Sequence, residues 1–342
     1  MQPTRAQRVV VIGASAGGVE ALRELFAALP PIQAAVLVVL HIPAHTPSNL
    51  SSILATVASM PVVVGVDGQP LHQGEVYVAS ADRHLAMDSN GLRVTRGPKE
   101  SRMRPAIDVL FRTASATYGP RAIGVVLSGT LDDGTAGLWA IKERGGMALV
   151  QDPQEAKFCS MPESAIQHVA VDLVGDVHAL ADAISNMTNE PVPSADTADV
   201  GGGHAIENKI AMSGNGLRAG VMTLGQVSKY TCPDCHGVLV QIEEGPIVRF
   251  RCHTGHAFTL KTLLAEINTS IDHGLWDAIR AIEERILLLR QTASLTAGED
   301  SETRAAQLNA LADQADAKLA PLRELVLDEN FFASPETASS PK

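Results

Sequence analysis

A serine lies at the centre of a glycine-rich turn close to the N-terminus. The letters GASAG at 13–17 have the pattern G-x-S-x-G and begin within the last residues of a strand-like run at 9–14. On a strand–turn–helix unit, this pattern presents a serine hydroxyl above the carboxyl end of the sheet, and its small neighbours let a substrate carbonyl approach. Ser15 is therefore the first candidate nucleophile.

The same turn permits two other interpretations. Dinucleotide-binding folds place G-x-G-x-x-G between a first strand and a first helix. Gly13 and Gly18 fit that register, but the middle position, where the backbone must approach a pyrophosphate, is Ser15. A packing turn with an incidental serine is the other alternative.

Two further polar segments follow apolar runs. His41 comes directly after the run at 34–40, and a glycine-rich loop with Asp132 and Asp133 follows the run at 122–128. Parallel strands place ligands at their carboxyl ends, so Ser15, His41 and one aspartate are expected on one sheet edge. A hydroxyl, an imidazole and a carboxylate together suit acyl transfer. A surface histidine and an Asp-Asp-Gly helix cap are the non-catalytic alternatives.

Apolar runs alternate with helical patterns through the first half of the chain. Continuous rather than alternating apolar runs are typical of a parallel sheet that is buried on both faces. We therefore predict an α/β fold, with a doubly wound, mainly parallel sheet flanked by helices and ending near residue 186. The predicted strands are 9–14, 34–40, 62–66, 74–79, 91–96, 122–128 and 147–151, and the predicted helices are 18–29, 48–59, 106–116 and 135–144.

The composition of the chain limits the kinds of partner and the cellular location that we expect. The 342 residues include 27 basic and 38 acidic side chains, a net charge of −11, so a nucleic-acid partner is not expected. The sequence has no apolar run long enough for a membrane span and no N-terminal signal-peptide cleavage pattern. We expect a cytoplasmic protein without membrane insertion.

Six segments in order resemble the catalytic domain of CheB-type protein-glutamate methylesterases of bacterial chemotaxis, over about residues 8–186. They read VVVIGASAGGVEAL, VVLHIPAH, GEVYVASADRHL, RPAIDVLFRTAS, GVVLSGTLDDGTAGLWAIKERGG and VQDPQEAKFCSMPESAI. The resemblance implies a Ser-His-Asp triad of Ser15, His41 and Asp133, with Asp132 as a loop former. It also implies hydrolysis of glutamate γ-methyl esters on methylated chemoreceptor-type proteins, deamidation of certain glutamines, and no cofactor for catalysis.

Other site positions follow from this chemistry. The backbone N–H of Ala16 is the natural oxyanion donor, and a second donor is expected from the Thr130 loop. Arg104 either lines the substrate groove or forms a salt bridge at a helix start. Only eight residues precede the first strand, so we expect a standalone form without a phospho-receiver domain. A binding or signalling module that has lost activity, and a nucleotide-binding α/β protein, are the competing hypotheses.

The chain changes character after residue 188. We predict a flexible linker at 189–204, because it is rich in proline and glycine, and then a connector and zinc-ribbon-like module at 205–258. Two knuckles, C-x2-C and C-x3-H, flank a predicted hairpin, and they make Cys232, Cys235, Cys252 and His256 the expected ligands of a structural Zn²⁺. An unligated thiol cluster is the alternative.

The C-terminal part has helical periodicity. Two apolar stripes with three- and four-residue steps, separated by a break at 296–300, predict a helical hairpin at 259–328. Their residues are Ile267, Ile271, Leu275, Ile279, Ile282, Ile286 and Leu289, then Leu308, Leu311, Ala315, Leu319 and Leu322. Such stripes form either an intrachain core or a surface for a signalling partner or a homo-oligomer. A disordered tail is predicted at 329–342.

Overall fold

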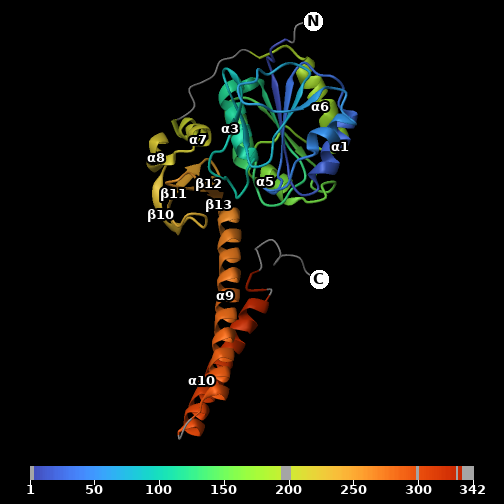
Figure 1. The fold of residues 1–342 in the computed structure, drawn as a ribbon. Helices are drawn as coiled ribbons and strands as arrows, with labels where there is room; N and C mark the ends of the chain where they lie inside the picture. Colours follow the sequence, from blue (N-terminus) through green and yellow to red (C-terminus); the bar gives the residue numbers. More distant parts are fainter. Residues whose placement is uncertain (1–3, 194–201, 298–299, 329, 333–342) are drawn as a thin grey trace. The chain divides into compact units, whose positions relative to one another are not determined.

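The computed structural model describes residues 4–193, 202–297, 300–328 and 330–332. Its contacts divide the chain into two units, 1–262 and 263–342, which are described separately. The first unit contains the predicted α/β fold and the cysteine-rich module (Figure 1). The predicted division into a catalytic domain at 1–188, a linker at 189–204, a zinc-ribbon-like module at 205–258, a helical hairpin at 259–328 and a tail at 329–342 stays a prediction.

The centre of the first unit is a seven-stranded parallel sheet with the strand order β3-β4-β2-β1-β7-β8-β9. The predicted mainly parallel sheet is thus confirmed. The chain leaves β1 toward β2 on one side and later returns to β7 on the other, so the strand order reverses beside β1. Open α/β sheets bind ligands at such a reversal, outside the carboxyl ends of the strands. The strands are β1 (Val9–Ala14), β2 (Ala35–Leu40), β3 (Val62–Val64), β4 (Val76–Val78), β7 (Ala122–Val126), β8 (Met147–Gln151) and β9 (Leu173–Gly175).

Helices cover both faces of this sheet (Figure 1). On one face, α1 (Gly18–Ala28), α2 (Leu50–Ala55) and α6 (Val177–Asn189) pack on one apolar cluster, and on the other face α3 (Ile107–Tyr118), α4 (Thr135–Glu143) and α5 (Ser160–His168) pack on a second. β1 and β2 contribute alternate side chains to both clusters, which explains why every residue of these two strands is buried.

The sequence predicted only one strand of a separate β-hairpin. β5 (His84–Asp88) and β6 (Gly91–Thr95) form a separate antiparallel hairpin beside α3. The run at 91–96 was therefore wrongly counted with the main sheet. His84 and Asp88 interrupt the apolar pattern of β5, and the burial of His84 depends on tertiary hydrogen bonds that periodicity does not reveal.

The cysteine-rich module contains an antiparallel sheet with the strand order β10-β11-β12-β13, preceded by two helices. The sequence predicted only its two central strands. Residues 194–201 of the predicted linker lie outside the described residues, and its last residues, from Gly202, belong to α7. His204 in α7 forms an ion pair with Glu244 and packs against Trp139, contacts that favour helix despite the glycines. The elements are α7 (Gly202–Ser213), α8 (Gly216–Ala219), β10 (Gln226–Thr231), β11 (Val238–Glu244), β12 (Ile247–Cys252) and β13 (Ala257–Thr259), with 3-10 turns at Gly119–Arg121 and Val221–Thr223.

A buried ion cluster ties this module to α3. Glu207 of α7 is 1% exposed and accepts hydrogen bonds from Arg249 and Arg251 of β12 at 2.8 Å. Arg251 and Arg112 of α3 also both lie 2.9 Å from Glu100. Burial alone would raise the pKa of Glu207, but the neighbouring arginine charges lower it well below its usual range. The cluster thus keeps its carboxylates ionised in the interior.

The second unit is built from the greater part of α9 (Leu260–Leu295) and from α10 (Ser301–Leu327). The two helices share an apolar core that includes Ile279, Ile286 and Leu319. Ile271 and Leu311, expected on the same stripes, are exposed. In the described part of the chain, no helix is long and apolar enough to cross a membrane. Of the predicted tail, 329 and 333–342 lie outside the described residues.

Candidate active site and metal centre

Ser15 begins the turn that leaves β1. Its backbone N–H donates to the carbonyl of Ser128 at 2.9 Å, and its own carbonyl accepts from the N–H of Gly18 at 2.9 Å. Gly17 has φ +73°, the left-handed conformation that glycine adopts most easily. These bonds hold the serine at the reversal point between β1 and β7.

His41 follows β2 and reaches across to this turn. Its backbone N–H donates to the carbonyl of Ala14 at 3.0 Å, which fixes the strand end beside the serine. The imidazole Nδ1 lies 3.2 Å from the hydroxyl oxygen of Ser15, and Nε2 lies 2.7 Å from the carboxylate Oδ2 of Asp133. The side chain of His41 is only 7% exposed, so water competes little for either bond.

Asp133 is held by the N-terminus of α3. Its Oδ2 accepts from the backbone N–H of Ile107 at 2.8 Å, and its Oδ1 accepts from the N–H of Asp108 at 3.1 Å. Burial opposes ionisation of Asp133, but the hydrogen bond and charge of His41, together with these two N–H groups, lower its pKa below the ordinary value. The helix N-terminus therefore favours the anion that faces the imidazole.

The side chain of Asp108, in the first turn of α3, binds the loop that carries Asp133. Its Oδ1 accepts from the backbone N–H groups of Gly134, at 3.0 Å, and Gly137, at 2.6 Å. Burial and the neighbouring Asp133 raise the pKa of Asp108 well above its usual range. Asp133 thus binds the N-terminus of α3, and Asp108 binds the N-terminus of α4.

The contacts of His41 with Asp133 and Ser15 define which ring nitrogen can act as a base. When Asp133 accepts a hydrogen bond from Nε2–H of His41, the lone pair of the neutral imidazole is on Nδ1, which faces the hydroxyl of Ser15. A serine, a base and a carboxylate connected in this order can perform nucleophilic catalysis.

The two predicted oxyanion donors lie on neighbouring loops. The carbonyl of Ala16 accepts from the hydroxyl of Ser128 at 2.8 Å, which holds the Ala16–Gly17 peptide next to the proposed donor. Among the described residues, no group accepts a hydrogen bond from the backbone N–H of Ala16 or of Thr130. Both N–H groups are therefore free of the competing bonds that would disqualify a donor.

Asp132 points away from the imidazole. Its Oδ1 accepts a hydrogen bond of 2.8 Å from the hydroxyl of Thr259, at the end of β13. Burial raises the pKa of Asp132 to about 6, although the bond from Thr259 opposes this change. The two adjacent aspartates thus have different partners, and only Asp133 contacts His41.

Arg104 forms an ion pair with Asp82, and its place in the substrate groove stays a prediction. Its Nε lies 2.9 Å from Oδ1 of Asp82, and its NH1 donates to the carbonyl of Gly97 at 2.7 Å. With these partners, the guanidinium supports the loop that precedes α3.

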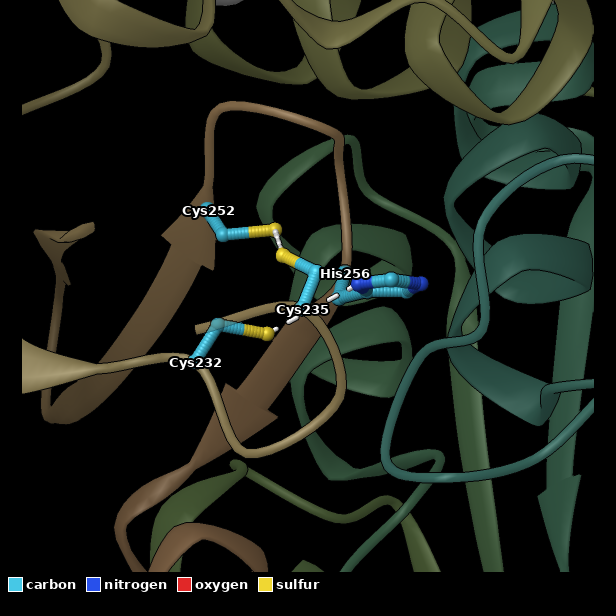
Figure 2. A group of neighbouring side chains, drawn as sticks. All are labelled: Cys232, Cys235, Cys252 and His256. Atoms are coloured by element: carbon cyan, nitrogen blue, oxygen red, sulfur yellow. Dashed lines mark hydrogen bonds between the residues drawn. The ribbon is translucent and has the colours of Figure 1, made fainter. Parts of the chain in front are cut away.

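The four predicted metal ligands lie together in the cysteine-rich module (Figure 2). Their ligand atoms are all within 4.8 Å of one another, with Cys235 Sγ 3.6 Å from Cys252 Sγ and Cys232 Sγ 3.6 Å from Nδ1 of His256. The sulfur–sulfur separation far exceeds a disulfide bond of about 2.05 Å. It approaches the ~3.8 Å expected between two sulfurs that share a tetrahedral zinc at ~2.3 Å. The donor set therefore fits Zn²⁺.

Three contributors were not foreseen from the sequence. By its sequence position, Asp108 is one of the acidic residues that are common in the first turn of a helix. Thr259 is 127 residues from Asp132, the aspartate that it contacts. Thr254 lies between two predicted ligands, with its hydroxyl oxygen 2.8 Å from Cys252 Sγ. Only the clustering of threonine near the second knuckle could have suggested the last of these.

Comparison with known proteins places the sheet and its site in one family. Residues 10–184, about half of the chain, match the family model described as CheB methylesterase. The chain is 37% identical over 182 residues to "Protein-glutamate methylesterase/protein-glutamine glutaminase of group 3 operon" of Bradyrhizobium diazoefficiens, covering 52% of this chain and 50% of that protein. It thus spans about half the length of the relatives of this kind.

A shorter relative and a solved structure extend the comparison. A putative protein-glutamate methylesterase/protein-glutamine glutaminase of Leptospira interrogans is 37% identical over 175 residues, which cover 51% of this chain and 91% of that protein. The crystal structure of the Thermotoga maritima CheB methylesterase catalytic domain superposes with a TM-score of 0.51 at 28% identity, covering 53% of this chain and 98% of that domain. These similarities favour the esterase interpretation of the Ser15 turn over the dinucleotide one.

Proposed function

Because this chain belongs to the CheB methylesterase family, we propose that it is a serine esterase that hydrolyses glutamate γ-methyl esters on chemoreceptor-type proteins. The observation that carries the proposal is the hydrogen-bonded series from Ser15 through His41 to Asp133. The names of the relatives, which couple methylesterase with glutaminase, support the substrate class.

The reaction proceeds in two halves. His41 takes the hydroxyl proton of Ser15 at Nδ1 while the serine oxygen attacks the ester carbonyl. The tetrahedral intermediate collapses as the same proton passes to the methoxy oxygen, and methanol leaves. Water then attacks the acyl-serine, with His41 again as base, and releases the glutamate carboxylate and the free hydroxyl.

Asp133 orients the imidazole through both halves. Its carboxylate fixes the proton on Nε2 and stabilises the imidazolium that forms when His41 accepts the serine proton. The N–H groups of Ala16 and Thr130 face the oxyanion in this proposal, and loss of one such donor typically costs ~100- to 1000-fold in rate.

A glutamine side chain can enter the same sequence. Attack on the γ-carboxamide forms the identical acyl-serine, and the proton held by His41 leaves with ammonia instead of methanol. The printed names of the relatives include protein-glutamine glutaminase, which supports deamidation as a second reaction of the same site.

Zinc completes the proposal outside the esterase site. Cys232, Cys235, Cys252 and His256 would hold one Zn²⁺ and use all four tetrahedral positions, so the metal would link β10–β11 to β12–β13 and take no part in catalysis. Thiolate ligation suits a reducing compartment, and we infer that the protein acts in the cytoplasm. Metal analysis should find one zinc per chain and a loss of zinc in Cys232→Ser; a folded, metal-free wild-type protein would contradict the site.

The esterase is tested by methanol release from a methylated chemoreceptor fragment. The wild-type chain should release methanol, and Ser15→Ala should reduce turnover to background while thermal unfolding stays unchanged. Turnover in Ser15→Ala equal to that of the wild type would eliminate Ser15 as the nucleophile. A wild-type chain that binds the fragment without releasing methanol would favour a signalling module that has lost activity.

A further inference from the structure

The loop that presents Asp133 has a buried contact outside the catalytic series. Asp132 is 8% exposed, and its side chain is hydrogen-bonded to Thr259 rather than to solvent. Leu131 has φ +64° and Gly134 has φ +97°, so the loop departs from ordinary backbone conformations on both sides of the two aspartates. Such a loop needs external contacts to hold one conformation.

Thr259 is itself rigidly placed. It is the residue before α9, and its hydroxyl oxygen accepts from the N–H of Thr262 at 3.1 Å while the hydroxyl oxygen of Thr262 accepts from the N–H of Thr259 at 2.8 Å. This reciprocal pair has the form of a capping box. The hydroxyl of Thr262 can donate to the carbonyl of Thr259, 3.3 Å away, which leaves the hydroxyl proton of Thr259 for Asp132.

β13 anchors Thr259 to the α/β fold by a second route. The N–H of Ala257 donates to the carbonyl of Lys99 at 3.2 Å, and the carbonyl of Ala257 accepts from the N–H of Ser101 at 2.8 Å. Residues 257–259 thus form an extra strand beside the segment that leads to α3, the helix whose N-terminus binds Asp133. The position of Thr259 is therefore set by the same framework as that of the catalytic carboxylate.

The two aspartates are joined by one peptide bond and have separate partners. The backbone carbonyl of Asp132 also accepts from the N–H of Thr135 at 3.2 Å, which closes the turn around Asp133. A shift of the Asp132 side chain must change this turn, and a misplacement of about 1 Å at a catalytic group can cost ~100-fold in rate.

We propose that Asp132 and Thr259 are a positioning pair through which the cysteine-rich module holds Asp133 against His41. The pair rests on the proposed esterase function and adds to it that the catalytic loop depends on a strand more than 120 residues away in sequence. Neither residue contacts the reacting atoms. Their effect on the rate passes through the orientation of Asp133.

The test measures kcat and KM for methanol release from a methylated chemoreceptor fragment by the full chain. Thr259→Val keeps the side-chain volume and removes the hydroxyl, and we expect kcat to fall on the order of 10-fold with KM nearly unchanged. Thr259→Ser restores the hydroxyl and should recover the wild-type kcat. Thr262→Val is the matched control, because it also breaks the capping box but leaves the bond from Thr259 to Asp132.

A second pair of variants covers the case in which Thr259→Val does not fold. Asp132→Ala removes the acceptor and should reproduce the fall in kcat, whereas Asp132→Asn retains an acceptor oxygen and should stay close to wild type. In the double variant Asp132→Ala/Thr259→Val, the two losses should not add, because one contact has been removed twice.

Each outcome has one meaning. Thr259→Val and Asp132→Ala with wild-type kcat, measured while Ser15→Ala is inactive, would overturn the positioning pair and leave the esterase intact. An equal fall in Thr262→Val would also overturn it, since the cap of α9 would then be the cause. A wild-type chain without turnover would overturn the esterase and the pair together.

Discussion

Replacing Asp133 with asparagine keeps the shape of the side chain but removes its negative charge and one hydrogen-bond acceptor. Each carboxylate oxygen of Asp133 accepts a backbone N–H, from Ile107 at 2.8 Å and from Asp108 at 3.1 Å, and Oδ2 also faces Nε2 of His41 at 2.7 Å. An amide has one acceptor oxygen, so either orientation leaves one of the two N–H groups facing an NH₂ group. A buried N–H without an acceptor costs ~1–3 kcal/mol of stability.

The same geometry sets the catalytic loss. If the amide NH₂ faces His41, it donates to Nε2, and the ring proton must move to Nδ1, where it blocks the acceptor that Ser15 needs. If the amide oxygen faces His41, the tautomer is correct but the imidazolium loses its counter-charge. Removing the charge of a triad aspartate in this way reduces kcat by ~10⁴-fold, or about 5.5 kcal/mol in the activation free energy.

Methanol release and thermal unfolding together test this prediction. Asp133→Asn should lose ~10³- to 10⁴-fold in kcat while it remains folded, with a modest fall in unfolding temperature. Asp132→Asn is the neighbouring control and should remain active. Asp133→Asn with a kcat within 10-fold of the wild type would refute the role of this carboxylate.

Three further predictions concern stability and shape. A Cβ at Gly129 would lie 2.1 Å from Sδ of Met161 and 2.9 Å from Cβ of Ser15, so Gly129→Ala should displace the nucleophile and reduce kcat by at least ~10-fold; unchanged kcat would show that the turn adapts. Burial raises the pKa of Asp132 from 3.8 to about 6, so the native state keeps a proton that the unfolded state loses, and stability falls as the pH rises between these values. Relative to wild type, Asp132→Asn should gain about 1.4 kcal/mol in the free energy of unfolding between pH 5 and 7.5, and urea midpoints with a pH-independent difference would contradict this. Glu207→Gln should cost ~3–5 kcal/mol at pH 7 because it removes one of the counter-charges of the buried Arg249 and Arg251. Since the folded pKa of Glu207 is lowered, this difference should shrink as the pH falls below 4.5, and a constant difference in denaturation midpoints would argue against the ion cluster as its source.

The sequence was sufficient for the parts of the site that end apolar strands. The runs that became β1, β2 and β7 are buried on both faces, so their ends are sharply marked by Ser15, His41 and the segment that leads to Asp133. Parallel pairing then brings these ends to one edge of the sheet, whatever the details of the loops. This is why the confirmed fold also gathers the candidate residues.

Long-range polar contacts could not be predicted in the same way. The bonds from Asp108 to Gly134 and from Thr259 to Asp132 join helix ends and strands that have no common periodicity. α7 begins within a glycine triplet because His204 and Glu207 find partners in the folded chain, which local propensity does not include. Tertiary ion pairs therefore stabilise the start of α7 against its weak local helix propensity.

Covalent labelling identifies the catalytic nucleophile directly. The wild-type chain is treated with a fluorophosphonate, which reacts with activated serines, and its peptides are analysed by mass spectrometry. We predict one adduct per chain on Ser15, with labelling lost in His41→Ala and strongly slowed in Asp133→Asn. A stoichiometric adduct on another serine, or labelling of Ser15 at the wild-type rate in His41→Ala, would contradict this prediction.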